Sequence, residues 1–200
     1  MPLSREDVVS AALTLSDERG AESLTLRALA AVLGVQAPSL YTHVRSKADL
    51  LDALGDRIMD EVLATVGPPE GETGWREWML DAARGLRAGL LRHTDGARIV
   101  ASARSSLRRA DFSERAVTAL IDAGVGRPEA RLTVLAVERF TVGYVLEEQS
   151  APPDDGGAGV DPAALMARLP NMTAAIIEYF EPGRTADDLF DDEIRLILRG

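Results

Sequence analysis

Cysteine is absent from the 200-residue sequence, and histidine occurs only as His43 and His93. Without cysteine the chain can form neither a disulfide nor a thiolate-ligated metal site. Two histidines do not make a metal site by themselves, so we expect no metal and no other cofactor. The sequence also lacks a serine-centred nucleophile elbow, a glycine-rich phosphate loop and an HExxH pattern. We therefore do not expect an enzyme.

Long hydrophobic runs are missing as well, since no stretch approaches the roughly 20 apolar residues of a membrane span. Residues 1–7 have neither a basic start nor an apolar signal core, which indicates a cytoplasmic protein without a membrane partner. Aromatic residues make up only 4% of the chain, and alternating apolar patterns are rare. Ala, Leu, Arg and Glu dominate instead. This composition predicts an all-α protein of about nine or ten helices.

Positive charge is scarce but unevenly distributed. The formal net charge is −10, and an acidic surface repels the phosphates of nucleic acids. Between Thr25 and Ala48, however, the chain carries Arg27, Arg45 and Lys47 and no acidic residue. The acids gather in the later part of the sequence. This distribution fits a protein that touches DNA at one end only, although solvated helix faces explain the acidic part equally well.

Capping residues mark the starts of several helices. Ser4 with Asp7, and Thr185 with Asp188, have the spacing of a cap with its third helical residue. The stretch 151–162 is rich in Pro, Gly and Asp and is expected to be a mobile loop. The predicted helices cover about residues 5–19, 25–33, 37–44, 47–66, 74–92, 97–103, 112–124, 128–149, 163–180 and 186–198.

Residues 24–44 carry the most specific local pattern. Two short helical segments flank a tight turn that starts at Gly34, and Ala30 is small where the two helices would approach closest. The residues that two crossing helices would bury between them are Leu29, Leu33, Val35 and Leu40. This is the spacing of a helix-turn-helix. A pair of ordinary core helices joined by a glycine turn has the same spacing.

In a helix-turn-helix, the second helix enters the major groove with its N-terminal residues leading. Ala37, Ser39 and Thr42 are short and suit methyl contacts or single hydrogen bonds, and Gln36 is the best candidate for an amide-to-base contact. Cations and hydroxyl groups around them can meet phosphates, which sets position without reading sequence. The predicted DNA-contacting residues are Thr25, Arg27, Gln36, Ala37, Pro38, Ser39, Tyr41, Thr42, His43 and Lys47.

Residues 5–55 resemble the DNA-binding domain of the tetracycline-repressor family of transcriptional regulators. The segments that carry the resemblance are LRALA at 26–30, LGV at 33–35, PSLYTHV at 38–44 and KADLL at 47–51. The resemblance extends to HTDGA at 93–97 and FTVGYVLEEQ at 140–149, so it covers most of the chain. It implies an all-helical homodimer. We expect a three-helix DNA-binding domain in residues 1–46 and a helical ligand-binding and dimerisation domain in residues 47–200.

The same resemblance implies a ligand pocket in the C-terminal domain, but not the pocket of the tetracycline-sensing members. Those members hold the drug as a magnesium chelate with a histidine at the place of Val100. Their other polar drug contacts fall here on Ala82 and Leu86, and only Glu147 matches the metal shell. A lone carboxylate among apolar neighbours holds magnesium poorly. We therefore expect a small, largely apolar effector with one or two polar groups.

The residues expected around this pocket are Leu63, Trp78, Ala82, Leu86, Val100, Ala103, Arg139, Phe140, Tyr144 and Glu147. Arg139 and Glu147 are the candidate polar anchors. The apolar members suit an ordinary packed core equally well. Arg139 and Glu147 lie two turns apart on one helix, so they also fit a charge pair or a dimer interface.

The resemblance thus predicts a ligand-responsive repressor that binds a palindromic operator as a homodimer. The dimer interface is expected on the helix that starts at Pro128 and on the last helix. It would set the two recognition helices about one DNA turn apart. A ligand-driven shift of the helix over residues 47–66 would then change that spacing and release DNA. The alternative is a DNA-binding regulator, activators included, with no ligand pocket.

Overall fold

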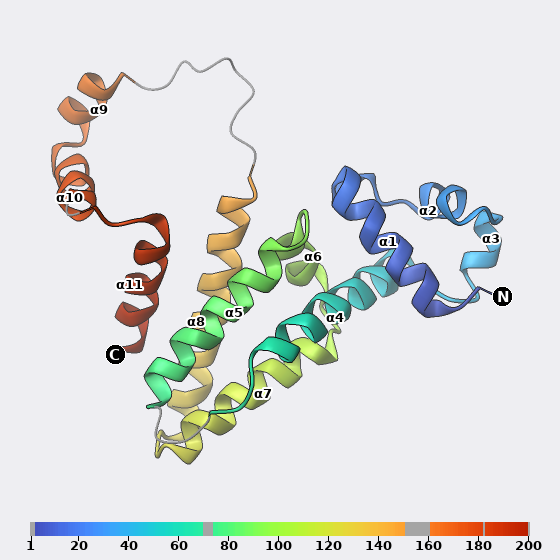
Figure 1. Cartoon of the computed structure of the whole chain (residues 1–200), viewed down its shortest axis with the longest axis horizontal. Helices are drawn as coiled ribbons and strands as arrows, with labels where there is room; N and C mark the ends of the chain where they lie inside the picture. Colours follow the sequence, from blue (N-terminus) through green and yellow to red (C-terminus); the bar gives the residue numbers. More distant parts are fainter. Residues whose placement is uncertain (1–2, 70–73, 151–160, 182, 200) are drawn as a thin grey trace. The chain divides into compact units, whose positions relative to one another are not determined.

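The computed structural model describes residues 3–69, 74–150, 161–181 and 183–199, which form helices joined by turns (Figure 1). No strand occurs in this part of the chain, and the predicted all-α class is confirmed. Residues 151–160 of the predicted mobile loop lie outside the described residues. Among the described helices, none combines the length and the apolar character needed to cross a membrane.

The chain divides into two compact units, one up to Gln149 and one from Ser150. The first unit contains α1 (Arg5–Arg19), a 3-10 turn (Ala21–Ser23), α2 (Leu26–Leu33), α3 (Ala37–Leu40), α4 (Lys47–Thr65), α5 (Trp75–Leu91), α6 (Gly96–Ser102), α7 (Leu107–Asp122) and α8 (Arg127–Glu148). The second contains α9 (Pro162–Arg168), α10 (Pro170–Phe180) and α11 (Ala186–Leu198). The expected domain boundary between residues 46 and 47 coincides with the start of α4 and stays a prediction.

Side-chain caps fix the starts of α1 and α11. Ser4 with Asp7, and Thr185 with Asp188, form complete capping boxes at the two helices. In each box the hydroxyl accepts from a backbone N–H of the first turn, and the carboxylate accepts from the backbone N–H of the cap. Two otherwise unpaired donors are satisfied in this way. The predicted starts of these helices are confirmed.

The recognition helix is shorter than predicted. α3 ends at Leu40 and not at Val44, because the chain tightens into a turn after its first four residues. The N–H groups of Tyr41 and His43 bond carbonyl oxygens three residues back, at 3.3 and 2.9 Å, which is the pattern of a 3-10 turn.

Two other helix boundaries also differ from the prediction. α7 begins at Leu107 because the hydroxyl of Ser106 caps it, accepting from a backbone N–H of the first turn. The single helix predicted over residues 163–180 is interrupted between α9 and α10. Pro170 has no N–H to continue the helix, and it restricts the backbone of Leu169 before it.

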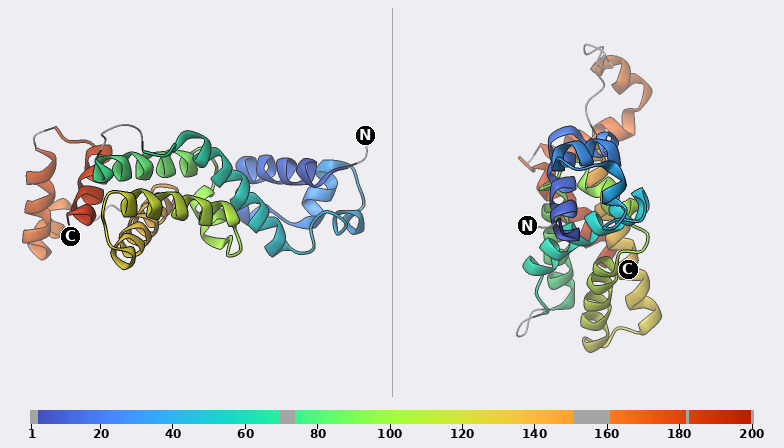
Figure 2. Two further views of the ribbon diagram at one scale, coloured as in Figure 1. Left: turned by 90° about the horizontal axis from the view of Figure 1, so that it is seen from below. Right: turned by 90° about the vertical axis from the view of Figure 1, so that its right-hand side faces the viewer.

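α4 is the central helix of the first unit, and it leads from α1–α3 into the bundle of α5–α8 (Figure 2, left). Ile58 and Val62 are fully buried along it. A Cβ atom placed on Gly55 of α4 would lie 2.4 Å from Cβ of Ala103, directly after α6. A Cβ atom on Gly89 of α5 would lie 2.3 Å from a methyl carbon of Val62. Glycine at these two positions therefore lets α4 pack at close range against its neighbours.

Candidate DNA interface and ligand site

Local chemistry builds the helix-turn-helix from α2 and α3. Thr25 caps α2 by accepting from the backbone N–H of Ala28, at 3.1 Å. Gly34 follows α2 with a φ of 67°, a left-handed conformation that glycine adopts without strain. Leu29 and Leu40 are fully buried, one on each helix, so the two helices share a packed face. The opposite face of the two helices does not take part in this packing and is open to a partner.

The predicted DNA-contacting residues are all exposed or half-buried. Tyr41 is 56% exposed, which is unusual for so large an aromatic ring. The half-buried members are Ala37 and His43. The exposed members are Thr25, Arg27, Gln36, Pro38, Ser39, Tyr41, Thr42 and Lys47. The predicted residues thus lie on α2, on α3 and in the turns beside them, and Lys47 is the first residue of α4.

Two hydroxyl groups of the recognition segment have fixed orientations. The Ser39 hydroxyl donates to the carbonyl oxygen of Gln36 at 2.7 Å, and the Thr42 hydroxyl donates to that of Ser39 at 2.7 Å. Each hydroxyl proton is therefore engaged by the backbone, and the lone pairs of each oxygen remain available. In the major groove such oxygens suit the exocyclic amino groups of adenine and cytosine.

Arg5 and Asp49 tie the recognition segment to α1 and α4. The Arg5 guanidinium donates to the carboxylate of Asp49 at 2.9 Å and also to the carbonyl oxygen of His43. Asp49 accepts from the backbone N–H of Arg45 at 2.7 Å, and Ser46 accepts from the backbone N–H of Asp49. The Ser46 side chain thus caps the start of α4. The ion pair with Arg5 was not predicted, because it joins residues far apart in sequence.

Asp49 should make folding stability depend on pH in the acid range. The pKa of Asp49 is lowered from 3.8 to about 2, first by the hydrogen bond from Arg5 and then by that from the Arg45 backbone. A depressed folded-state pKa means that this stabilisation is present above about pH 4 and is lost as the pH falls towards 2. Asp49→Asn should therefore unfold at lower urea concentration at neutral pH and lose less stability on acidification.

Urea unfolding midpoints of both proteins across this pH range test that expectation. Glu18→Gln, an exposed substitution on α1, is the matched control and should behave like the parent protein. Equal acid sensitivity of the parent and Asp49→Asn would contradict the role given to this ion pair.

The turn between α5 and α6 holds the end of α1. The His93 ring lies 3.0 Å from the Asp17 carboxylate through Nδ1 and 3.2 Å from that of Glu61 through Nε2. Thr94 donates to Asp17 from both its backbone N–H and its hydroxyl. Asp95 accepts from the backbone N–H of Ala21 at 2.8 Å. Polar contacts thus join the DNA-side helices to the bundle behind them.

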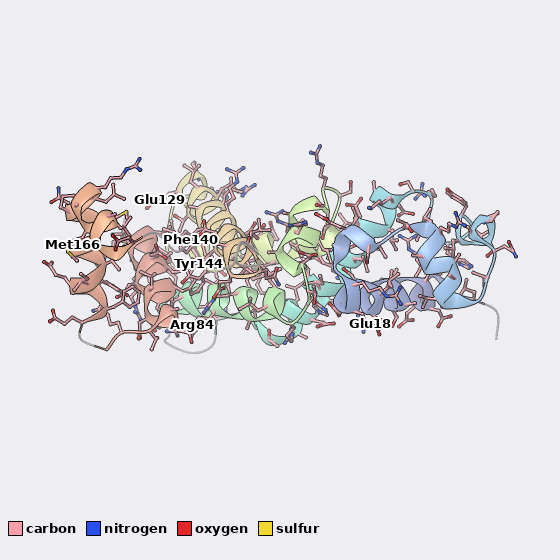
Figure 3. The ribbon with its side chains drawn as sticks, turned by 90° about the horizontal axis from the view of Figure 1, so that it is seen from above. Glu18, Arg84, Glu129, Phe140, Tyr144 and Met166 are labelled. Atoms are coloured by element: carbon pink, nitrogen blue, oxygen red, sulfur yellow. The ribbon has the colours of Figure 1, made fainter. Side chains whose placement is uncertain are left out.

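The structure separates the predicted ligand residues into an inner and an outer group. The buried members are Trp78, Ala82, Leu86, Val100 and Ala103, and Leu63 is half-buried. The outer group lies on α8: Arg139 and Glu147 are exposed, whereas Phe140 and Tyr144 are half-buried. Phe140 and Tyr144 are neighbours on α8 (Figure 3), and their rings lie 5.7 Å apart. The Arg87 guanidinium lies 5.5 Å from the Tyr144 ring.

A small cavity of about 10 Å³ lies inside the bundle. Its lining residues are Met59, Leu86, Val100, Arg109, Phe112, Glu138 and Val142. Only Leu86 and Val100 were predicted, and neither exposed candidate anchor lines the cavity. A volume of this size holds about one water molecule. A drug-sized ligand would have to enlarge it.

Glu138 and Arg109 are the polar groups of this cavity. Glu138 is only 3% exposed, its carboxylate accepts from the Ser113 hydroxyl, and Arg109 Nε lies 3.8 Å away. Burial raises the pKa of Glu138, and the hydrogen bond from Ser113 opposes that rise. A signal for this residue exists in the sequence. Glu138 is an acid within the helical apolar stripe that includes Val134 and Val145.

A larger hollow of about 630 Å³ opens at the surface between the start of α5 and α7. Trp75, Arg115 and Pro69 are among its lining residues, and the Arg115 guanidinium donates to backbone carbonyls at the end of α4. None of its lining residues was predicted for the ligand site, whereas Leu86 and Val100 line the inner cavity. We therefore place the candidate ligand site at the inner cavity.

Two short helices share a buried face, carry an exposed recognition segment and are joined to a helical bundle. This arrangement defines a helix-turn-helix regulator. Two family models match the chain: "Bacterial regulatory proteins, tetR family" over residues 8–54 and "Tetracyclin repressor-like, C-terminal domain" over residues 67–200. The chain belongs to the TetR family of transcriptional regulators, which is a non-enzymatic family.

Relatives cover nearly the whole chain. The tetracycline repressor protein class A from transposon 1721 of Escherichia coli is 37% identical over 99% of this chain and 90% of its own length. A TetR variant from Acinetobacter baumannii AYE in complex with minocycline has a TM-score of 0.75 and 31% identity, covering 99% of this chain and 92% of that one. BioQ with its double-stranded DNA operator has a TM-score of 0.67 and 32% identity, covering 74% of this chain and 88% of the BioQ chain.

Proposed function

We propose that this protein is a ligand-responsive transcriptional repressor. It binds a palindromic operator as a homodimer and leaves it when a small, largely apolar molecule enters the inner cavity. The observation that carries this proposal is α4, which begins beside the recognition turn at Asp49 and contributes Met59 to the cavity. One rigid helix thus adjoins both candidate sites. The operator in the related BioQ structure and the minocycline in the related TetR structure support binding of both kinds of partner.

Exposed apolar side chains on α10 support the homodimer. Met172, Ile176, Ile177 and Phe180 are 37–50% exposed and recur at helical spacing. A two-fold interface buries the same patch of both subunits, so one such face per chain is sufficient. On α8, in the expected interface, Leu132 is 67% exposed. We assign α10 to the dimer interface together with α8 and the last helix.

Ligand entry would act through Met59. Because the cavity holds only about 10 Å³, a larger molecule must displace its lining, and Met59 is the lining residue on α4. The close packing of Gly55 against Ala103 restricts local bending of α4. α4 would therefore move as a body, and a ligand that prefers the moved state would release DNA through its differential affinity for the two states.

Operator release by a compound screen tests the proposal. Purified protein is bound to labelled DNA from upstream of its own coding region, and compounds are scored for loss of fluorescence anisotropy. Release by at least one compound that also binds the free protein is the expected result. The small size of the cavity favours one alternative, a DNA-binding regulator with a sealed core. That alternative is supported if DNA is bound and no compound of any class releases it.

Tetracyclines with magnesium should not act on this protein. Val100 is buried and has no metal-binding atom, and no group of three potential metal ligands occurs among the described residues. Glu138 is the one acidic residue in the described lining of the cavity, and a lone carboxylate holds magnesium poorly. Minocycline fluorescence should therefore be unchanged by the protein, with or without magnesium, and the protein–operator complex should persist. Tight, magnesium-dependent binding would contradict this expectation.

A further inference from the structure

The unusual group in the inner cavity is a buried carboxylate. Glu138 lies in the apolar stripe of α8 and is 3% exposed, and it shares the cavity with apolar side chains such as Met59, Leu86 and Phe112. Removing a carboxylate from water is unfavourable unless charges or hydrogen bonds replace the water. What pairs with Glu138 in the ligand-free chain therefore indicates what the cavity is built to receive.

The pairing of Glu138 is incomplete. A carboxylate can accept about four hydrogen bonds, and the described residues provide one, from the Ser113 hydroxyl. Arg109 Nε is 3.8 Å from the carboxylate, which is beyond hydrogen-bond distance, and the Arg109 side chain is 30% exposed. The hydroxyl of Thr141, one turn along the same helix, is fully buried and has no partner among the described residues. Thr141 does not line the cavity, so the unused acceptor capacity inside the cavity is that of Glu138.

We infer that the effector is an organic cation, with an apolar body and a protonated amine or similar group that pairs with Glu138. The inference rests on the proposed function, because it names the class of ligand for the same cavity. A protonated amine supplies the missing hydrogen-bond donors and can replace Arg109, at 3.8 Å, as the counter-charge. An anionic ligand would be repelled by the carboxylate of Glu138. Arg109, whose side chain is 30% exposed, can turn towards solvent as the ligand enters.

Three charge-matched probes test the inference on the full-length protein. They are naphthalen-2-ylmethylamine, naphthalen-2-ylmethanol and 2-naphthoate, which share one apolar body and differ in charge. Binding is measured by isothermal titration calorimetry at neutral pH. The amine should bind the parent protein at least about tenfold more tightly than the alcohol, and the naphthoate should bind most weakly. This comparison needs no variant.

Variants then locate the charge preference. Glu138→Gln keeps the size of the side chain and should reduce amine affinity to that of the alcohol while leaving alcohol affinity unchanged. Glu129→Gln, an exposed substitution on the same helix, is the matched control and should change neither. Arg109→Gln removes the competing cation, so amine affinity should be kept or increased. Thermal melting of each variant identifies any loss of folding.

The outcomes separate this inference from the proposed function. Equal binding of amine and alcohol by the parent protein, tightest binding of the naphthoate, or an unchanged amine affinity in folded Glu138→Gln would overturn the cationic effector. Each of those results leaves a ligand-responsive regulator intact. If none of the three probes binds, the cationic effector is overturned. If, in addition, no screened compound releases the operator, the proposed ligand response is overturned with it.

Discussion

Replacing both Ile176 and Ile177 with aspartate should yield a monomer that has lost most of its operator affinity. These residues lie side by side on the exposed apolar face of α10, at 48% and 50% exposure. Two charges on each subunit would have to lose water in a two-fold interface, which is strongly unfavourable. Each monomer would then bind a half-site alone. Losing the second, linked binding event should lower the affinity by about 10²- to 10⁴-fold.

Analytical ultracentrifugation and fluorescence anisotropy on the same samples test this expectation. Leu107→Asp is the matched control, because it places the same charge on an apolar side chain that is 73% exposed at the start of α7. The control should stay dimeric and bind DNA normally. An aspartate variant that remains dimeric would refute the placement of the interface, and a monomer that keeps full affinity would refute operator binding by the dimer.

Replacing Tyr41 with alanine and Lys47 with glutamine in one protein should lower operator affinity by at least about 100-fold. Both side chains are exposed on the open face of the helix-turn-helix, and a dimer carries each of them twice. Hydrogen bonds to charged groups contribute about 1.5–3 kcal/mol each. Loss of the two lysine contacts should also reduce the slope of log affinity against log salt by about 1.8, since each phosphate contact contributes about 0.9.

The salt dependence distinguishes lost phosphate contacts from a damaged fold. Lys47→Gln alone should weaken binding to operator and to unrelated DNA by similar factors, because phosphate contacts carry no sequence information. Arg127→Gln, at the start of α8, is the control and should leave affinity and slope unchanged. Retention of DNA by the double variant would be incompatible with a DNA interface at Tyr41 and Lys47.

Much of the DNA-side structure could be predicted because it depends on neighbouring residues. Thr25 and Gly34 set the two ends of α2 through contacts within a few residues, so both helix ends can be recognised in the sequence. Local signals were also present where the predictions were wrong. Ser106 is an ordinary cap that precedes α7, and Pro170 separates two helices where the pattern predicts one.

The ligand side was harder to predict because its geometry depends on which helix faces meet in space. The resemblance implies that Arg139 and Glu147 lie near the pocket, but both are exposed. The polar pair that does line the cavity, Arg109 with Glu138, comes from two helices packed against each other. Only Glu138 carried a local signal, an acid in an apolar stripe. The ion pair of Arg5 with Asp49 carried none.

DNase I footprinting of the DNA upstream of the gene tests the central claim most directly. The claim is that two copies of the chain present the segment from Gln36 to Val44 to successive turns of one duplex. We expect two protected half-sites related by two-fold symmetry, with centres one helical turn apart, about 10 base pairs. The claim would be contradicted if only one half-site were protected, or if no DNA were protected at protein concentrations that keep the dimer intact.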